Sequence, residues 1–400
     1  MSPVKIAFLI CLVVWGYLFT TTKSIIAFDS LDYIDSGALI AQEGIAEYIR
    51  SGPRREPGYP LLVAAAVRLG GRDPVACLRF LQLAVFGVSV LLFILLLRYF
   101  NVPGPVQAGA VLMMGCSPAI ITSVLSVYSE QLAIPLVLGS VYFLIRRKGI
   151  PAGVFLFLLT MVKAAYEVAV PVFFVLMLIT RRKVAISALI VFLIGVNGYK
   201  AANWALNGHY VVTNRAEWAL YGSIKRRTEP LSLGLWKAGI LSVAGKGACE
   251  RVCSKAECAY WSFEKSDEFG FARMKKGGEI GIGESFSMIL NRPAQSTFFS
   301  VLEGTKMFFW ETTRLGFVNF PERIERVLAN KIFGDSIRML MALLSMIGFA
   351  VCGVIVFNKK EYDEHSGIEK GPFKDCGCPS HHGHGQRGWV GCPECNPPDI

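Results

Sequence analysis

Residues 76–98 read ACLRFLQLAVFGVSVLLFILLLR, a long apolar run whose only charged residues are two arginines. A bilayer core about 30 Å thick needs about 20 apolar residues per helix, so this run predicts a membrane-spanning helix. With shorter stretches accepted as partial spans, we expect an all-α polytopic membrane protein with about 9–10 hydrophobic segments. These segments are 4–22, 58–70, 76–98, 105–123, 130–147, 150–163, 165–180, 184–204, 296–313 and 338–357.

The composition of the whole chain agrees with this class. Hydrophobic residues make up 53% and charged residues 18%, and the mean hydropathy is +0.46. Soluble globular chains carry about 25% charged residues, so a soluble enzyme, a disordered chain and a disulfide miniprotein are excluded. The net charge of +11 includes basic runs at 146–148 and 181–183 that flank apolar segments. This placement is typical of the positive-inside bias and favours membrane lipids, not nucleic acid, as the partner.

The order of polar and apolar stretches divides the chain into six parts. Lys5 precedes the first apolar run and no small-residue cleavage site follows it, which favours an uncleaved signal anchor. With both basic runs in the cytoplasm, the two long polar inserts lie outside, and an even number of spans must separate them. We therefore assign 58–70, which contains Arg68, to a half-span. The parts are 1–22 signal anchor, 23–57 first external loop, 58–204 core transmembrane helices, 205–295 large external loop, 296–357 C-terminal membrane helices and 358–400 polar tail.

Three carboxylates follow the first apolar segment. Asp29, Asp32 and Asp35 lie at i, i+3 and i+6, so on a helix the first two are near neighbours. Such carboxylates act as a general base or as ligands of a hard cation. The alternative interpretation is a solvated loop in which Asp29 caps a helix. Arg54-Arg55-Glu56-Pro57-Gly58-Tyr59-Pro60 then opens the second apolar segment.

These motifs resemble a known family. Asp-Ser-x-x-Tyr at 29–33 followed by Arg-x-Pro-Gly-Tyr-Pro at 55–60 resembles the GT-C membrane glycosyltransferases. The resemblance is greatest to the bacterial family-39 type, related to protein mannosyltransferases and to the aminoarabinose transferase of lipid A. It covers residues 1–215 and includes 128–130 and 203–208.

The resemblance implies a GT-C-like helical bundle with extracytoplasmic loop helices. Such an enzyme takes a sugar from a polyprenyl-phosphate donor and passes it to a lipid, glycan or protein acceptor. The implied location is the bacterial cytoplasmic (inner) membrane, with the active site facing outward.

The resemblance also implies roles for the acidic residues. Asp29 matches the catalytic aspartate, and Asp32 is the competing assignment because it directly precedes Tyr33. Such a carboxylate takes the proton of the acceptor hydroxyl and stabilises an oxocarbenium-like transition state. Glu130 matches a second acidic residue that shares a divalent cation, Mg²⁺ or Mn²⁺, with Asp29. The alternative for Glu130 is a helix-start glutamate favoured by the helix dipole.

The negative charge that develops on the leaving phosphate requires cations nearby. Arg55, with Arg54 beside it, is the first candidate because a guanidinium binds phosphate oxygens bidentately. Lys163 is the second, because a charge between apolar stretches is costly unless it is paired or used. Its alternative is an ion pair with Glu167 at i+4. Tyr33 and Tyr59 are accessory, with interfacial packing favoured over acceptor contact.

Cysteines fall in two groups. Cys249, Cys253 and Cys258 lie in the large loop, where an oxidising compartment would pair two and leave one free. In the tail, two close cysteine pairs bracket a histidine run and resemble a zinc site, with a flexible tail as the alternative. The tail cysteines are Cys376, Cys378, Cys392 and Cys395.

Two other functions fit the same composition. A lipid-linked-sugar flippase or transporter would place Lys163 and Glu167 along a path at the membrane midplane. A non-catalytic membrane assembly factor would use the cysteine-rich tail as its interaction module and would not need Asp29.

Overall fold

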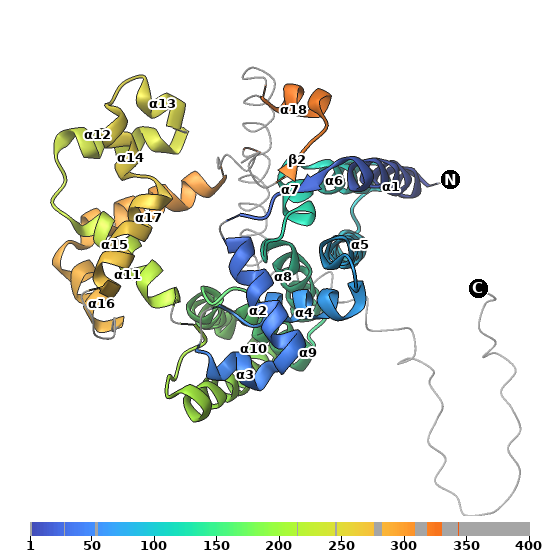
Figure 1. Ribbon diagram of the computed structural model, residues 1–400, viewed down its shortest axis with the longest axis horizontal. Helices are drawn as coiled ribbons and strands as arrows, with labels where there is room; N and C mark the ends of the chain where they lie inside the picture. The colour runs from blue at the N-terminus through green and yellow to red at the C-terminus, as the bar shows by residue number, and fades with distance from the viewer. Residues whose placement is uncertain are drawn as a thin grey trace, which may run out of the picture. The chain divides into compact units, whose positions relative to one another are not determined.

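The computed structural model describes residues 2–27, 29–52, 55–213, 215–244, 246–275, 282–308, 318–329 and 343. All of these belong to one compact unit. The described chain is mostly helical (Figure 1). The all-α class expected from the composition is therefore correct.

Ten helices make up the described chain as far as residue 213. Several begin at a proline, whose missing N–H costs nothing at a helix start. Asp73 caps the longest early helix, because its carboxylate accepts a hydrogen bond from the backbone N–H of Ala76 at 2.9 Å. The helices are α1 (Pro3–Thr21), α2 (Asp29–Glu43), α3 (Ile45–Arg50), α4 (Gly58–Gly70), α5 (Pro74–Tyr99), α6 (Gly104–Cys116), α7 (Pro118–Leu125), α8 (Glu130–Ile145), α9 (Gly149–Val162) and α10 (Tyr166–Asn207).

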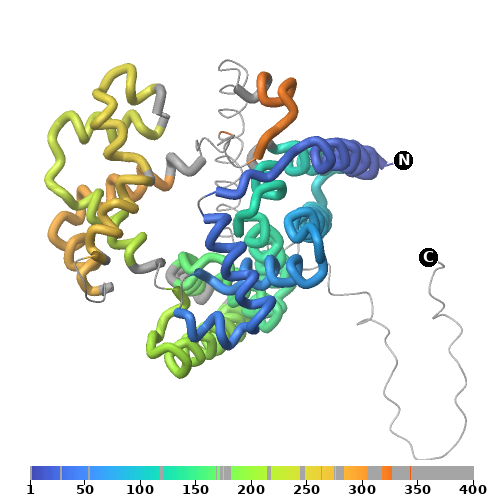
Figure 2. The backbone as a smooth tube through the Cα atoms, in the orientation of Figure 1, coloured from blue at the N-terminus to red at the C-terminus, as the bar shows by residue number. Residues whose placement is uncertain are grey.

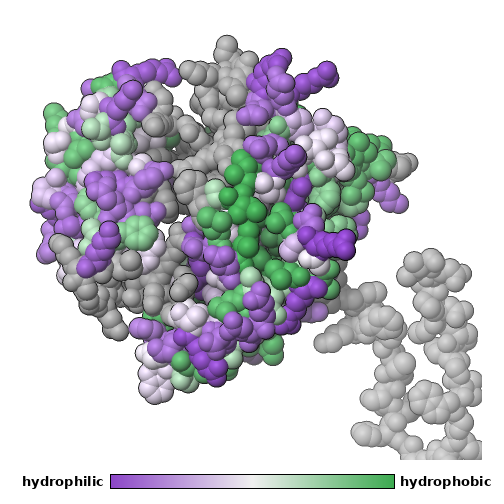
Figure 3. Space-filling view, in the orientation of Figure 1, coloured by the Kyte–Doolittle hydropathy of each residue, from purple (hydrophilic) through white to green (hydrophobic). Residues whose placement is uncertain are grey.

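Three stretches in the described chain are long and apolar enough to cross a membrane: α1, α5 and the Arg182–Asn207 part of α10. Four further helices, α4, α6, α8 and α9, are apolar but shorter. Helix α1 exposes a run of large apolar side chains, as contact with lipid requires. Figure 3 shows hydrophobic residues gathered in patches on the face in view. These features indicate a helical membrane protein.

Helix α10 corrects the predicted division of its region. It runs unbroken for 42 residues, about 63 Å, through the basic run at 181–183. The segments 165–180 and 184–204 are therefore one helix, and Arg181-Arg182-Lys183 do not form a loop. The physical reason is that arginine and lysine are good helix formers and no glycine or proline lies near them. The assignment of 58–70 to a half-span counted 165–180 and 184–204 as two separate spans, so that count no longer supports it.

A second difference lies in the predicted segment 105–123. The structure divides it at Ser117, with α6 before and α7 after. Pro118 follows directly, and a proline disfavours the helical conformation of the residue before it. By contrast, the short segment 58–70 coincides with α4.

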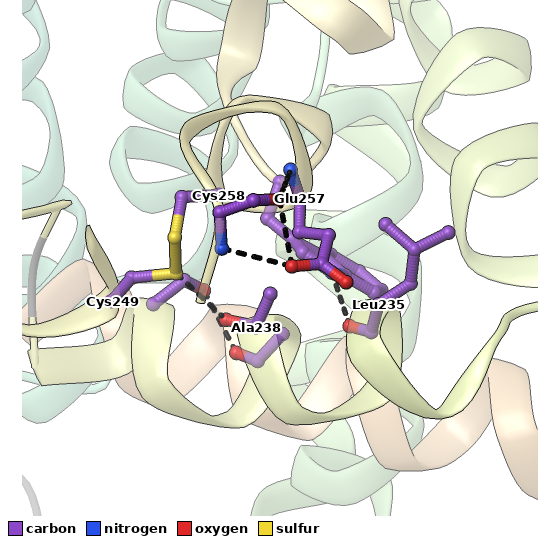
Figure 4. The surroundings of a disulfide bond; sticks show 9 residues. Leu235, Ala238, Cys249, Glu257 and Cys258 are labelled. Carbon is purple, nitrogen blue, oxygen red and sulfur yellow. Dashed lines mark hydrogen bonds between the residues drawn. A yellow bond between two sulfur atoms is a disulfide. The ribbon is translucent and has the colours of Figure 1, made fainter. Parts of the chain in front are cut away.

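The large predicted loop is helical. A small core includes Ala238, Trp261 and Phe299 together with Cys249 and Cys258. These two cysteines form a disulfide, and Figure 4 shows it beside Ala238. Cys253 remains a free thiol, so the expected pattern of one pair and one free cysteine is present. The elements of the predicted loop are α11 (Arg215–Thr228), α12 (Leu233–Leu241), η1 (Ser242–Ala244), α13 (Lys246–Glu250), α14 (Lys255–Tyr260), α15 (Phe263–Lys275) and α16 (Ile282–Asn291). Helix α17 (Pro293–Phe308) overlaps the predicted membrane segment 296–313, and its Phe299 packs into the same core.

One strand pair was not predicted. Strand β1 (Lys23–Ser24) pairs antiparallel with β2 (Val318–Asn319), and α18 (Glu322–Ala329) follows. Figure 2 shows the chain after α1 and the segment before α18 lying side by side, as this pairing requires. Two residues are too short to carry the alternating pattern by which a strand is recognised.

Close packing of α9 on α10 depends on glycine. A Cβ added at Gly153 would lie 2.5 Å from the carbonyl oxygen of Ala188 and 2.8 Å from Cβ of Val191. At Gly198 on α10, a Cβ would meet nothing within 4 Å. We expect Gly153→Ala to lower the free energy of unfolding by about 1–3 kcal/mol, because overpacking forces the helices apart. Gly198→Ala is the control and should raise it by up to about 1 kcal/mol.

Urea unfolding in detergent micelles, followed by circular dichroism, measures both variants. Equal midpoints for the two glycine variants would show that this contact does not hold α9 against α10.

Candidate functional site

The predicted site residues come together where several elements begin or end. Asp29 and Asp32 occupy the first turn of α2, and Arg55 lies in the irregular segment before α4. Glu130 is the first residue of α8, and Lys163 follows the last residue of α9. These positions place charged side chains at helix ends, where the backbone leaves polar groups unpaired.

Arg55 is the centre of the site. Its Nη2 donates to Oδ1 of Asp29 at 2.7 Å and to Oδ2 of Asp32 at 2.6 Å. Its Nη1 donates to Oδ2 of Asp29 and its Nε to Oδ2 of Asp32, both at 3.2 Å. One guanidinium therefore holds both candidate catalytic carboxylates. Asp29 is not a lone helix cap, because its carboxylate binds a residue far along the chain.

The environment of Arg55 fixes it in place. The residue is only 3% exposed, and its guanidinium lies 5.0 Å from the ring centre of Tyr33. Burial by itself lowers the pKa of Arg55, but the bonds to Asp29 and Asp32 outweigh burial and raise this pKa above its usual value. The hydroxyl of Tyr48 donates to the backbone carbonyl of Arg55 at 2.6 Å, and this bond fixes the backbone at Arg55.

Tyr33, which lies beside Arg55, packs against Tyr59. Both are buried, so they pack inside the protein, and their position relative to the membrane interface stays a prediction. Their rings meet edge to face at 4.8 Å, and the hydroxyl of Tyr33 lies 2.9 Å from that of Ser129. Tyr33 thus joins the first loop to the start of α8.

Lys163 pairs with Glu130, its Nζ lying 2.7 Å from Oε1. The alternative pair with Glu167 does not form, and Glu167 pairs with Lys200. The reason is that Lys163 has an extended backbone and precedes α10, so the two residues do not share one helix and the i, i+4 relation does not exist. Lys163 and Glu130 are brought together only by the packing of α8 on α9.

Two buried polar atoms near this pair lack a hydrogen-bond partner within the described residues. They are the hydroxyl of Tyr59 and Oε2 of Glu130. One is a donor and the other an acceptor, so together they match a hydroxyl group, which donates and accepts. The site therefore has hydrogen-bonding capacity that the described side chains do not use.

Glu56 is a site residue that the sequence interpretation missed. Its Oε1 accepts a hydrogen bond from the backbone N–H of Ala164 at 2.9 Å. Glu56 lies next to Arg55 in the chain, and Ala164 lies next to Lys163. Its position inside the Arg-Arg-Glu-Pro motif was the available signal.

The predicted divalent cation does not fit this arrangement. Both oxygens of Asp29 accept from Arg55, and Oε1 of Glu130 accepts from Lys163, so protein cations take the places that a metal would need. Within the described ranges, no group of three or more His, Cys, Asp or Glu side chains is placed to hold a metal ion. We derive no step through a metal.

Five predicted residues lie outside the described residues. They are Arg54 and the four tail cysteines Cys376, Cys378, Cys392 and Cys395. The zinc prediction therefore stays a prediction.

The pKa of Asp267, an acidic residue of α15, is shifted in part by the charge of Asp29. Burial, the charge of Asp29 and the charge of Glu264 raise the pKa of Asp267 to about 6, from an ordinary value of 3.8. The folded state thus holds this proton more tightly than the unfolded state. Below about pH 3 both states are protonated, and the raised pKa of Asp267 has no effect on stability. As the pH rises from about 3 to 6, the unfolded state gains first from ionisation, and the folded state becomes relatively less stable.

We therefore expect Asp267→Asn to raise the free energy of unfolding by about 1 kcal/mol above pH 6, after solvent screening, and to leave it unchanged below about pH 3. Thermal unfolding at the two pH values measures this. Glu268→Gln is the control, because Glu268 is exposed and pairs with Lys265. An Asp267→Asn effect of equal size at both pH values would contradict the raised pKa.

Comparison of the chain with protein-family models, with curated proteins and with solved structures finds no match in any of the three. The resemblance to the GT-C glycosyltransferases therefore rests on the motifs of the sequence alone.

Proposed function

We propose that the protein is an integral-membrane glycosyltransferase of the GT-C type. It would transfer a sugar from a polyprenyl-phosphate donor to a lipid, glycan or protein acceptor. The observation that carries this proposal is the contact of one buried arginine, Arg55, just before the apolar helix α4, with two carboxylates, Asp29 and Asp32, in the first turn of α2. A cation and a base held within one hydrogen bond of each other are what transfer from a phosphate-linked sugar needs.

The reaction divides between these side chains. The acceptor oxygen forms a bond to the anomeric carbon of the sugar while the bond from that carbon to the phosphate oxygen breaks. The acceptor proton passes to a carboxylate oxygen of Asp29, and the bonding electron pair leaves with the phosphate. Arg55 and Lys163 neutralise the charge that develops on the phosphate. Asp32 keeps Arg55 in place.

Binding of the donor is expected to change the hydrogen bonding of Asp29, the proposed base. A carboxylate that accepts two bonds from a guanidinium is a weak base, because those bonds stabilise its charged form. The donor phosphate is a diester with one negative charge, and it competes for the same guanidinium. It gains a second negative charge as the sugar leaves, which would draw Arg55 further toward the phosphate and release an oxygen of Asp29 for the proton.

The proposed location is a bacterial inner membrane with the site on the outer side. The support for the outer side is the disulfide in the large loop, because disulfides persist in oxidising compartments. A long helix such as α10 would then carry its basic residues at 181–183 toward the opposite, cytoplasmic surface.

Purified protein in detergent, given radiolabelled polyprenyl-phosphate sugars and total membrane acceptors, tests the proposal. We expect label to move to an acceptor. Vesicles that contain the protein should in parallel show no sugar-lipid translocation. Translocation without transfer would favour the flippase, and neither activity would favour an assembly factor.

A further inference from the structure

The start of α4 and the end of α9 are packed tightly at the site. Residues 55–57 lead into α4, whose first residue is Gly58, and residues 163–164 follow Val162, the last residue of α9. A Cβ added at Gly58 would lie 2.7 Å from Cγ2 of Val162 and 2.8 Å from the carbonyl oxygen of Met161. Only glycine permits this approach, so the two backbones lie directly against each other.

The hydrogen bond from Ala164 to Glu56 joins the same two segments. Ala164 is 4% exposed and lies between two helices, where its N–H has no helical partner. A buried N–H that loses its acceptor destabilises the folded state, because its lost bond to water is not replaced. The Glu56 carboxylate supplies the acceptor, and a charged acceptor gives a stronger bond than a neutral one.

Each segment also carries a candidate phosphate ligand. Arg55 directly precedes Glu56, and Lys163 directly precedes Ala164. The hydrogen bond therefore joins the residues that follow the two cations. Both cations also lie close to Tyr33, whose pKa is raised by burial and lowered in part by the charges of Lys163 and Arg55. Neither α4 nor α9 would hold the two side chains together by itself, because both cations lie outside the helices.

We propose that Glu56 is a positioning residue that holds Lys163 at a fixed distance from Arg55, so that the two cations form one binding site for the donor phosphate. Glu56 acts through the backbone N–H of Ala164 and does not touch the donor. This inference rests on the proposed glycosyltransferase function.

Two substitutions separate this positioning role from a role of the charge. Glu56→Gln keeps a side-chain oxygen that accepts from Ala164, whereas Glu56→Ala removes it. We expect Glu56→Ala to raise the KM for the donor at least about tenfold with kcat within about threefold of the wild type. Glu56→Gln should keep the KM within about threefold of the wild type. Glu47→Ala is the control, because Glu47 is an acidic residue on α3 that pairs with the exposed Arg50.

Binding of a radiolabelled short-chain polyprenyl phosphate to the purified full chain distinguishes the two ways in which the idea can fail. An unchanged donor KM in Glu56→Ala, or an equal loss in Glu56→Gln, would overturn the positioning role alone. Binding that is tight in the wild type and about tenfold weaker in Glu56→Ala, with no transfer by either, would overturn the proposed function and keep the positioning role. Absence of both binding and transfer in the wild type would overturn both.

Discussion

Asp29→Asn is expected to reduce kcat for sugar transfer by about a thousandfold and to leave the protein folded. The amide keeps the shape of the carboxylate but cannot take the proton of the acceptor. It also cannot stabilise the positive charge that develops on the sugar. The measurement is transfer of radiolabelled sugar from the polyprenyl-phosphate donor, with thermal unfolding to verify that the variant is folded.

Two neighbours on α2 are matched to this variant. Asp35→Asn changes an exposed carboxylate further along the same helix and should retain wild-type transfer. Asp32→Asn tests the competing assignment. It should retain more activity than Asp29→Asn, because we assign Asp32 to holding Arg55 and not to proton transfer. If Asp32→Asn loses transfer and Asp29→Asn keeps it, Asp32 is the base.

Arg55→Ala is expected to show the largest combined effect, on both transfer and stability. It removes a guanidinium that is 3% exposed and leaves two carboxylates close together without their cation. Breaking an ion pair from one side costs more than the pair contributes, because the remaining charges lose their partner. Asp29 and Asp32 are partly exposed, so we expect a loss of about 2 kcal/mol in the free energy of unfolding. Transfer should become undetectable.

The test combines stability and activity. Urea unfolding of Arg55→Ala, of Asp29→Ala and of the double variant gives the coupling energy between the two residues. Arg50→Ala is the control, because Arg50 forms an exposed pair with Glu47 whose loss should cost about 0–1 kcal/mol. Arg55→Lys should recover part of the stability but little of the transfer, because an ammonium group cannot bind two acceptors bidentately. A coupling energy near zero between Arg55 and Asp29 would contradict the observed geometry.

Much of the fold follows from local sequence. The apolar runs at 4–22, 58–70 and 76–98 became α1, α4 and α5, because a continuous apolar stretch of this kind without an internal turn signal favours a buried or membrane helix. The places where the expectation was wrong are boundaries. The basic run at 181–183 was expected to separate the segments 165–180 and 184–204, but charge does not end a helix, and these residues are good helix formers.

The candidate site was also predicted only in part from the sequence. Asp29, Asp32 and Arg55 stood out because charges at the edge of an apolar block need a reason. Their mutual contact did not follow from spacing, since Arg55 and Asp29 are joined by the folding back of an irregular segment onto α2. Spacing even suggested a false partner for Lys163, because the i, i+4 rule applies only where one helix contains both residues.

The sequence by itself determined the class of the protein, the helical segments and the short list of charged residues that deserve a role. Composition and hydrophobic runs are properties of neighbours along the chain, so they are visible without a structure. Only the tertiary structure decided which charges pair: Arg55 with both aspartates, Lys163 with Glu130, and Glu56 with the backbone of Ala164. These partners are far apart in sequence and meet because helices pack, which no local pattern records.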